Sequence, residues 1–369
     1  MNNKNFQTYF DCGFSKIRAG TFNKNKHSDA FFAESKFLKD SSNLELEIQK
    51  IITSFEEYTN EYIDTINLMV DSPEMFSIGV SISKKLDGST LKQTNVQFLI
   101  QEAKQQIVKY YANQNITHII INKYKIDGID YSYLPNEIKC NFVSLNILFI
   151  CLPTDLVLYF KNIFSKSNIL INQIICTSYA KSINYKDNLN LKGYVSFIDV
   201  GFKRTSIICY FNDKIISLDV LPIGGNHITK DIAQILEIDL KKSEHLKRNF
   251  GKSLSHSDDE NISIDSLQKI IFARTEEILE LCKKIMESNL YLDGKLRIVL
   301  TGEGSKIFNN QYKDKISILS DIDHINKTTE NICYLGFKLG KGLNKQEVVV
   351  VPKKQVKQGF FEKFFHFFR

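Results

Sequence analysis

Short apolar runs alternate with segments of helical spacing along most of this chain, which is the pattern of an α/β protein. Gln7–Ala19 predicts a strand and a tight turn that opens a second strand, and Ile66–Val70 predicts another strand. Between them, Leu44–Tyr62 repeats its apolar residues on one helical face. Helical spacing predominates over Ile228–Leu290, and Arg297–Ile307 then returns to a strand, a turn and a helix.

The stretch from about residue 75 to residue 152 has a different pattern of apolar residues. Strand-like apolar runs surround a segment of helical spacing near Val96–Tyr111, which predicts a small α+β insert. Its low glycine content indicates no catalytic loop. We expect Pro153 to begin a helix that continues through Phe164, after which the chain returns to the first set of elements.

A second, similar set of elements begins at Gly193. GYVSFIDVG (193–201) predicts a strand that enters a turn, and further strand-like runs follow it. The start of the chain has the same order in TYFDCGFSKIRAGTF (8–22): an apolar strand, Asp-x-Gly, a basic residue and another strand. This weak internal duplication predicts two related lobes that close on one cleft.

Three glycine turns after predicted strands could hold phosphate groups. They are Asp11–Gly13 with Ser15 and Lys16, Asp199–Gly201 with Thr205, and LTGEGS (300–305). Glycine lets backbone amides approach phosphate oxygens, and an aspartate can hold hydrated Mg²⁺ through water. A lone Asp-x-Gly more often closes a hairpin, but three such turns in this order are much more specific.

Length, composition and charge narrow the class of protein. At 369 residues the chain is too long for one ordinary compact domain, and 43% hydrophobic with 24% charged residues excludes wholesale disorder. The net charge of +6 is concentrated between Lys338 and Arg369, which include eight basic and two acidic residues. A neutral body with a basic C-terminal segment argues against a nucleic-acid partner and for one electrostatic contact made by the C-terminus.

The seven cysteines are scattered, without a CxxC pair or clustered histidines. This spacing predicts reduced, mostly buried thiols of a cytosolic protein and argues against zinc. The N-terminus lacks the pattern of a signal peptide, and polar residues interrupt the most apolar stretch, Phe142–Phe160. We therefore expect a chain that is neither secreted nor integral to a membrane.

The C-terminal segment 358–369, QGFFEKFFHFFR, separates its side chains by face. At about 100° per residue, its phenylalanines fall on one side of a helix and its charged residues on the other. Such a segment is too short to span a bilayer but suits an interface with anionic lipid. The alternative is that its rings dock on the protein's own surface. The residues expected to bind the membrane are Phe360, Phe361, Lys363, Phe364, Phe365, Phe367, Phe368 and Arg369.

Several segments together resemble the phosphate and adenosine motifs of the actin/Hsp70 superfamily: FDCGFSK, FIDVGFKRTSIICYF, LPIGGNHITKDIA, SEHLKRNFG and IVLTGEGSKI. PIGGNHITKDIA followed by SEHLKRNFG is most similar to FtsA, the bacterial cell-division actin homologue, and the tail is similar to the membrane-targeting helix of FtsA. The resemblance implies an α/β, actin-like two-lobed ATPase fold of duplicated RNase H-like lobes. It also implies an FtsA-type 1C insert and a C-terminal amphipathic helix.

The resemblance further implies a division of the chain into six parts. They are lobe 1A (1–74 and 153–192), insert 1C (75–152), lobe core 2A (193–227 and 291–341), helical subdomain 2B (228–290), a flexible linker (342–357) and the membrane-targeting helix (358–369).

In that family ATP binds between the two lobes, and the matching residues here are carried over as expectations. Those facing the phosphates and Mg²⁺ are Asp11, Gly13, Ser15, Lys16, Asp199, Gly201 and Thr205, with Asp11 as the metal-holding residue. Those around the ribose, base and underside of the nucleotide are Gly224, Gly225, Glu244, Lys247, Gly302, Gly304 and Ser305.

The chain departs from the family pattern at three places. Gly201 is followed by Phe202, Lys203 and Arg204 instead of further glycines, and these side chains either crowd the phosphates or supply charge to them. Glu303 also replaces a usual glycine. Cys176 stands where hydrolytic relatives have a water-orienting Glu or Gln, and a thiol is a poor base for water. We therefore predict slow or absent turnover, that is, a weak ATPase at most.

The resemblance implies several partners. They are the C-terminal peptide of the tubulin-like ring protein FtsZ, further copies of the chain in filaments, an anionic lipid membrane, and other division proteins bound through the insert. FtsZ is expected to dock on 228–290 with Arg274 pairing an acidic group, although Arg274 could instead pair only with Glu277. The expected location is the cytoplasmic face of the inner membrane at the division site.

Two alternatives share the fold. A kinase-like ATP-dependent phosphotransferase would need a carboxylate base in the cleft and intact phosphate glycines. A PilM-like pilus-assembly actin homologue would have a similar insert. Neither has a reason for the phenylalanine-rich tail, which favours the FtsA-like adaptor.

Overall fold

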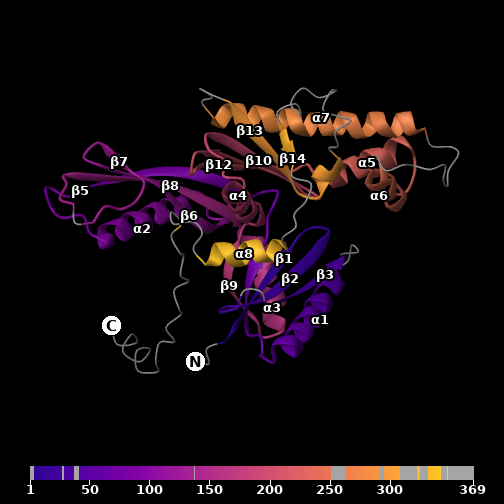
Figure 1. The fold of residues 1–369 in the computed structure, drawn as a ribbon, viewed down its shortest axis with the longest axis horizontal. Coiled ribbons are helices and arrows are strands. Elements are labelled where there is room, and N and C mark those ends of the chain that lie inside the picture. Colours follow the sequence, from indigo (N-terminus) through magenta and orange to yellow (C-terminus); the bar gives the residue numbers. More distant parts are fainter. Residues whose placement is uncertain are drawn as a thin grey trace.

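Two five-stranded sheets with the same strand order form the cores of two lobes (Figure 1). The computed structural model describes residues 4–26, 29–36, 41–136, 138–250, 263–290, 295–307, 322–324, 331–341 and 347. The strand order is β3-β2-β1-β4-β9 in the first sheet and β12-β11-β10-β13-β14 in the second. In each sheet three antiparallel strands are followed by two parallel ones. The predicted pair of related lobes is confirmed.

The strands lie where the apolar runs predict them. Those of the first sheet are β1 (Phe6–Cys12), β2 (Lys16–Asn23), β3 (Ala30–Lys36), β4 (Thr65–Met69) and β9 (Leu170–Ile175). Those of the second are β10 (Tyr194–Val200), β11 (Thr205–Phe211), β12 (Lys214–Leu221), β13 (Leu296–Thr301) and β14 (Ile322–His324). The central strands β1 and β10 are buried on both faces, which explains their almost continuous apolar sequence.

Helices cover both sheets. On the outer side of the first sheet lie α1 (Ser41–Thr59) and α3 (Thr154–Lys166), whose Phe55 and Phe164 pack against Phe10 of β1. Each of these fully buried rings stabilises the fold by roughly 1.5–3 kcal/mol. Between the lobes lie α4 (Thr177–Asn188) and α8 (Ile332–Gly340).

The second lobe has the long helix α7 (Ile264–Asn289) along the outer side of its sheet. Its apolar face includes Ile278, Cys282 and Met286, which are buried against the strands. The shorter helices α5 (Gly225–Ile235) and α6 (Leu240–Asn249) pack beside one end of α7 and form a separate small core with it. After β13 the described residues form a 3₁₀ turn, η1 (Gly304–Ile307), where the expected helix would begin, and this described stretch ends at Ile307.

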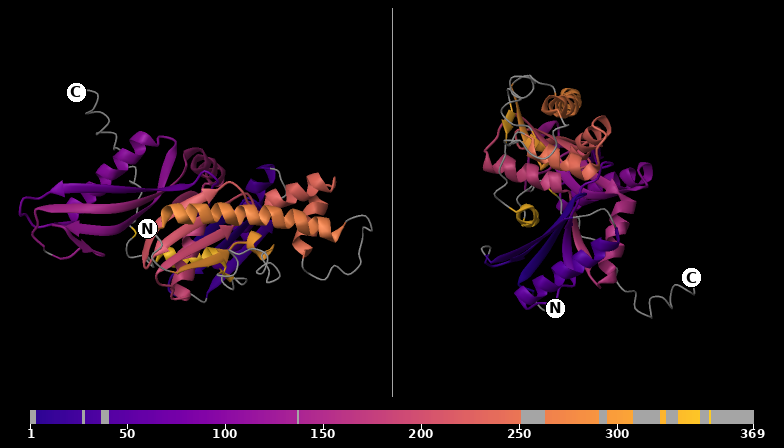
Figure 2. Two further views of the ribbon diagram at one scale, coloured as in Figure 1. Left: turned by 90° about the horizontal axis from the view of Figure 1, so that it is seen from above. Right: turned by 90° about the vertical axis from the view of Figure 1, so that its right-hand side faces the viewer.

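The insert forms a third sheet with its own core, which extends away from the two lobes (Figure 2). Its elements are β5 (Phe76–Lys85), α2 (Gln93–Tyr110), β6 (Gln114–Ile126), β7 (Ile129–Tyr131) and β8 (Phe142–Pro153). The strand order is β5-β8-β6-β7, and α2 packs on this sheet. The Ser77 hydroxyl accepts a hydrogen bond of 2.8 Å from the amide of Leu218, which ties the insert to β12.

The seven cysteines are all buried and unpaired, as the spacing predicts. Near the C-terminus, Glu347 bridges to Ile120 of β6, and its carboxylate lies 2.6 Å from Nδ1 of the buried His118. No helix among the described residues is long and apolar enough to cross a membrane. The expected membrane-targeting helix at 358–369, and the expected linker apart from Glu347, lie outside the described residues.

Candidate nucleotide cleft

Three aspartates meet between the lobes because each lies at, or just after, the carboxyl end of a strand that faces the cleft. Asp11 lies at the end of β1 and Asp199 at the equivalent position of β10. Asp71 follows β4, the parallel neighbour of β1, and accepts hydrogen bonds from the amide and hydroxyl of Ser178 at the start of α4. Parallel strands bring their carboxyl ends to one edge of a sheet, so the fold itself gathers these acids.

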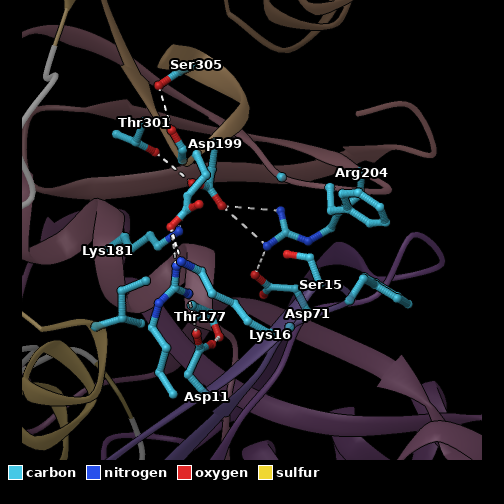
Figure 3. Close-up of a pocket in the computed structure, with 18 of the residues that line it drawn as sticks. Asp11, Ser15, Lys16, Asp71, Thr177, Lys181, Asp199, Arg204, Thr301 and Ser305 are labelled. Carbon is cyan, nitrogen blue, oxygen red and sulfur yellow. Dashed lines mark hydrogen bonds and ion pairs between the residues drawn. The ribbon is translucent and has the colours of Figure 1, made fainter. Parts of the chain in front are cut away.

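A cavity of about 130 Å³ lies where these strand ends meet (Figure 3). Four carboxylates in its wall are paired directly with four basic side chains. The carboxylates belong to Asp11, Asp71, Asp199 and Glu303, and the basic groups belong to Lys16, Arg18, Lys181 and Arg204. This side of the cleft is called the phosphate side below.

Asp199 is the most completely enclosed member of the network, with a side chain only 2% exposed. Lys181 of α4 donates to one carboxylate oxygen at 2.9 Å, and Arg204 lies 3.3 Å from the other. Thr301 adds a third hydrogen bond at 2.9 Å. Burial opposes ionisation, but the two cations outweigh it and lower the pKa of Asp199 far below its ordinary value.

Arg204 joins the two lobes. It belongs to the turn between β10 and β11, pairs with Asp199 of its own lobe, and hydrogen-bonds Asp71 of the other lobe. Its side chain is buried, and Ser206 accepts a further hydrogen bond from it. Burial raises the pKa of Asp71 despite the attraction of Arg204, and the nearby charge of Asp199 adds to the rise.

Glu303 makes a second connection between the lobes, nearer to solvent. This residue of the second lobe forms ion pairs with Lys16 and Arg18 of β2, and its carboxylate lies 2.6 Å from Arg18. Arg18 also holds Asp11 at 3.0 Å, and Thr177 donates to Asp11 at 2.8 Å. Burial alone would raise the pKa of Glu303, but the hydrogen bond and charge of Lys16, with Arg18, lower it to about 2.

The two phosphate turns contact each other. The ammonium group of Lys203 lies 5.0 Å from the centre of the Phe14 ring, across the mouth of the cleft. The amide of Gly13 donates to the carbonyl of Lys16 at 3.1 Å, and that of Gly201 donates to Arg204 at 2.8 Å. Both amides are therefore used within their own turns.

The remaining glycines of the expected site bring backbone segments together. A Cβ at Gly224 would lie 2.6 Å from the carbonyl oxygen of Gly201, so this position accepts only glycine without a shift of the backbone. Gly302 has φ +87°, which other residues rarely adopt. Thr205 is fully buried and donates to the carbonyl of Ile223 at 2.7 Å; it lines neither cavity. The hydroxyl of Ser305 donates to Gly302 at 2.7 Å.

A second cavity of about 280 Å³ adjoins the first and shares Ser15, Phe202 and Glu303 with it. It is called the nucleoside side below. The residues expected around the ribose and base that line it are Gly225, Glu244, Lys247 and Gly304.

Lys247 is buried in the wall of the nucleoside side. Its ammonium group donates to the carbonyl of Gly225 at 2.8 Å, to Thr229 at 2.7 Å and to Glu244 at 2.5 Å. These three acceptors match the three N–H donors of a lysine. Burial lowers the pKa of Lys247, whereas the hydrogen bond from Lys247 lowers the pKa of Glu244 in spite of its own burial.

These contacts test whether the residues fit Mg²⁺ and the phosphates of ATP. Mg²⁺ prefers oxygen ligands in octahedral geometry, but Asp11, Asp71 and Asp199 already accept hydrogen bonds from basic side chains. Within the described ranges, no three His, Cys, Asp or Glu side chains are grouped so that they could hold a metal ion. The residues present do not fit a bound Mg²⁺–phosphate group.

Comparisons with known proteins address the family directly. A family model for "Cell division protein FtsA" matches residues 196–349. The FtsA of Agrobacterium fabrum is 22% identical over 301 residues, covering 76% of this chain and 67% of that protein. The FtsA of Buchnera aphidicola subsp. Acyrthosiphon pisum is 23% identical over 354 residues, covering 82% of each. The resemblance to FtsA is confirmed.

A solved structure supports the fold. The "PilM-PilN type IV pilus biogenesis complex" superposes with a TM-score of 0.61 at 13% identity, covering 91% of this chain and 97% of that one. At this identity the likeness shows the fold alone. Together with the repeated strand order, it confirms the actin-like α/β fold.

Two residues singled out by the FtsA resemblance lie away from the cleft walls. Cys176 lines neither cavity, and burial raises the pKa of its thiol well above the ordinary value. Arg274 of α7 makes two hydrogen bonds to Asp231 of α5, at 2.6 and 3.0 Å. It also donates to Glu277 at 2.6 Å, so the expected i,i+3 pair is present but is not the main contact.

The FtsA motifs did not indicate several residues that the structure places in the cleft: Arg18, Asp71, Thr177 and Lys181. Asp71 could have been found by aligning β4 with β13, because the pairing registers place it at the position that Glu303 has in the second lobe. Lys181 has no local signal, because it reaches Asp199 from a helix of the other lobe.

Proposed function

We propose that this chain is a cell-division adaptor of the FtsA kind, which holds FtsZ at the cytoplasmic face of the inner membrane and self-associates there. The observation that carries the proposal is the match to FtsA over residues 196–349, which span the second lobe and its helices α5, α6 and α7. The phenylalanine-rich segment 358–369 supports the membrane part, since its sequence separates aromatic from basic residues by helical face.

The proposed contact for the acidic C-terminal peptide of FtsZ is the surface around Arg274. The side chain of Arg274 is 27% exposed, and it donates two hydrogen bonds to Asp231 of α5. That hydrogen bonding raises the pKa of Arg274, so the group stays charged. Asp231 and Glu277 accept from three of the five N–H donors of this guanidinium, and the other two are left for a carboxylate of the peptide. Because these contacts hold the side chain in place, little of its freedom is lost on binding.

The peptide contact is tested by fluorescence anisotropy with a labelled FtsZ C-terminal peptide. We expect Arg274→Ala to weaken binding at least about tenfold, as for the loss of a charge-assisted hydrogen bond of about 1.5–3 kcal/mol. The matched control is Lys269→Ala, which removes one positive charge from the same helix at a side chain that is 76% exposed. Equal affinity of the wild type and Arg274→Ala would contradict this contact.

The membrane contact is tested by sedimentation with anionic and with neutral vesicles. We expect binding to anionic vesicles only, and a loss of about tenfold or more in Phe364→Asp, because burying one such side chain is worth roughly 1.5–3 kcal/mol. Phe142→Asp is the control, since Phe142 is an exposed phenylalanine of the insert. Similar losses in both variants would contradict an anchor at 358–369.

The proposed surface for self-association and for other division proteins is the insert. Its helix α2 exposes Phe98, Val108 and Tyr110, with exposed fractions of 57%, 57% and 69%.

For ATP we propose weak binding at most, through the nucleoside side and without Mg²⁺. The 280 Å³ cavity has room near Glu244 and Gly304, whereas ion pairs occupy the phosphate side. A kinase-like role is not favoured, because the carboxylates of the phosphate side are paired and none is placed to act as a base.

A further inference from the structure

The charges that close the cleft come from opposite lobes. Arg204 of the second lobe reaches Asp71 of the first, and Lys181 of the first lobe reaches Asp199 of the second at 2.9 Å. Glu303 of the second lobe reaches Lys16 and Arg18 of the first. Each of these ion pairs would be lost if the lobes separated.

Arg204 occupies the centre of this arrangement (Figure 3). Its guanidinium group contacts carboxylates at the ends of two strands that belong to different sheets, Asp71 after β4 and Asp199 of β10. The side chains of these aspartates are 3% and 2% exposed. Two buried carboxylates of like charge can both be ionised only with a cation between them, because an isolated buried charge is very costly.

The position of Arg204 also follows from the local backbone. The carbonyl of Arg204 accepts the amide of Gly201, and its amide lies against Gly224, which has no Cβ to displace it. Its neighbour Lys203 faces the ring of Phe14, across the mouth of the cleft. The turn that was expected to hold phosphate therefore directs Arg204 inward, toward the acids.

We propose that Arg204 is the built-in cation of this cleft, which joins Asp71 to Asp199 and holds the two lobes closed without a divalent metal or a nucleotide. The chain then reaches its closed form by folding alone. This inference goes beyond the adaptor role and does not depend on it, because it involves neither FtsZ nor lipid.

The first test uses the full-length wild-type protein. We expect its thermal unfolding midpoint to change by less than about 1 °C when EDTA is replaced by millimolar MgCl₂, with or without ATP, since a ligand stabilises only the state that binds it. Calorimetric titration with ATP should give the same weak or absent heat in MgCl₂ as in EDTA. Micromolar, Mg²⁺-dependent binding of ATP by the wild type would overturn the proposal, whatever the variants do.

The second test creates the metal site that Arg204 replaces. In Arg204→Ala, Asp71 and Asp199 lose the cation between them, so we expect a lower midpoint in EDTA and a rise of about 4 °C or more in MgCl₂. Arg204→Lys keeps a cation and should show no response to Mg²⁺. The double variant Arg204→Ala with Asp71→Asn removes one carboxylate and should also lose the response.

The control is Arg297→Ala, which removes an exposed arginine at the far end of β13. Its midpoint should match that of the wild type in both buffers. If Arg204→Ala and Arg204→Lys both unfold at the wild-type midpoint in EDTA, Arg204 holds nothing together and the proposal fails. If Arg204→Ala is destabilised but does not respond to Mg²⁺ or Mn²⁺, Arg204 is only a packing residue, which overturns its role as a substitute cation.

Discussion

Charged residues line both sides of the cleft, but they leave different amounts of open space. On the phosphate side, acids and bases from both lobes pair directly and leave about 130 Å³. On the nucleoside side, Lys247 and Glu244 pair within the second lobe, and about 280 Å³ stays open beside them. The first set of ion pairs spans the lobes, whereas the second only shapes one wall.

This difference indicates that two proteins can share a fold and still fill the cleft between the lobes with different side chains. The strand ends place Asp11 and Asp199 where the FtsA motifs predict them, yet the cations beside them come from the chain itself. A buried ion pair gains little over an apolar contact, but removing one partner is strongly destabilising. The phosphate side should therefore respond to mutation as part of the core, and the nucleoside side less so.

The largest effect is expected at the centre of the phosphate side. Asp199→Ala leaves Lys181 and Arg204 without their shared acceptor, and we expect the free energy of unfolding to fall by about 3–5 kcal/mol. Urea unfolding followed by circular dichroism measures it. Asp213→Ala is the control, because the side chain of Asp213 is 87% exposed and its pair with Lys186 is worth at most about 1 kcal/mol. A loss below about 1 kcal/mol in Asp199→Ala would show that the cross-lobe pairs do not hold the lobes.

A smaller effect is expected on the nucleoside side. Lys247→Met keeps the length of the side chain but removes three hydrogen bonds. It also leaves less positive charge beside the carboxylate of Glu244. We expect a loss of about 2 kcal/mol, in the range of a hydrogen bond to a charged group. Lys269→Met, at a side chain that is 76% exposed, should cost almost nothing in the same urea titration. A loss in Lys247→Met as large as in Asp199→Ala would remove the contrast between the two sides.

The smallest effect is expected at the edge of the phosphate side. Folding lowers the pKa of Glu303 from its ordinary 4.5 to about 2, so its stabilising contribution is complete above about pH 4.5 and is lost as the pH falls toward 2. The side chain is 50% exposed, so solvent screens the pairs with Lys16 and Arg18. Wild type and Glu303→Gln should therefore differ by at most about 1 kcal/mol near neutral pH and converge as the pH falls from 4.5 to 2. A difference that grows over this range would contradict the assigned pairs.

The fold could be predicted from the sequence to a large extent, because apolar runs and helical spacing report local burial. The strand before Asp11 and the strand before Asp199 are examples, and their similarity indicated the duplication. The side chains that occupy the cleft, and the partners they pair with, could not be predicted in the same way. Lys181 and Asp71 act through partners in the opposite lobe, and no local pattern encodes such a contact. Arg204 departs from the FtsA motif in the sequence, but the direction of its side chain depends on how the lobes close.

We propose an FtsA-like adaptor whose cleft is closed by its own side chains. The most direct measurement is flotation of anionic vesicles with the full-length protein and a labelled FtsZ C-terminal peptide, in EDTA and without nucleotide. We expect the peptide to rise with the vesicles as well in EDTA as in MgCl₂ with ATP, and to stay behind when Arg274 is replaced by alanine. A peptide that rises only in MgCl₂ with ATP would contradict the self-closed cleft, and one that rises in neither buffer would contradict the adaptor function.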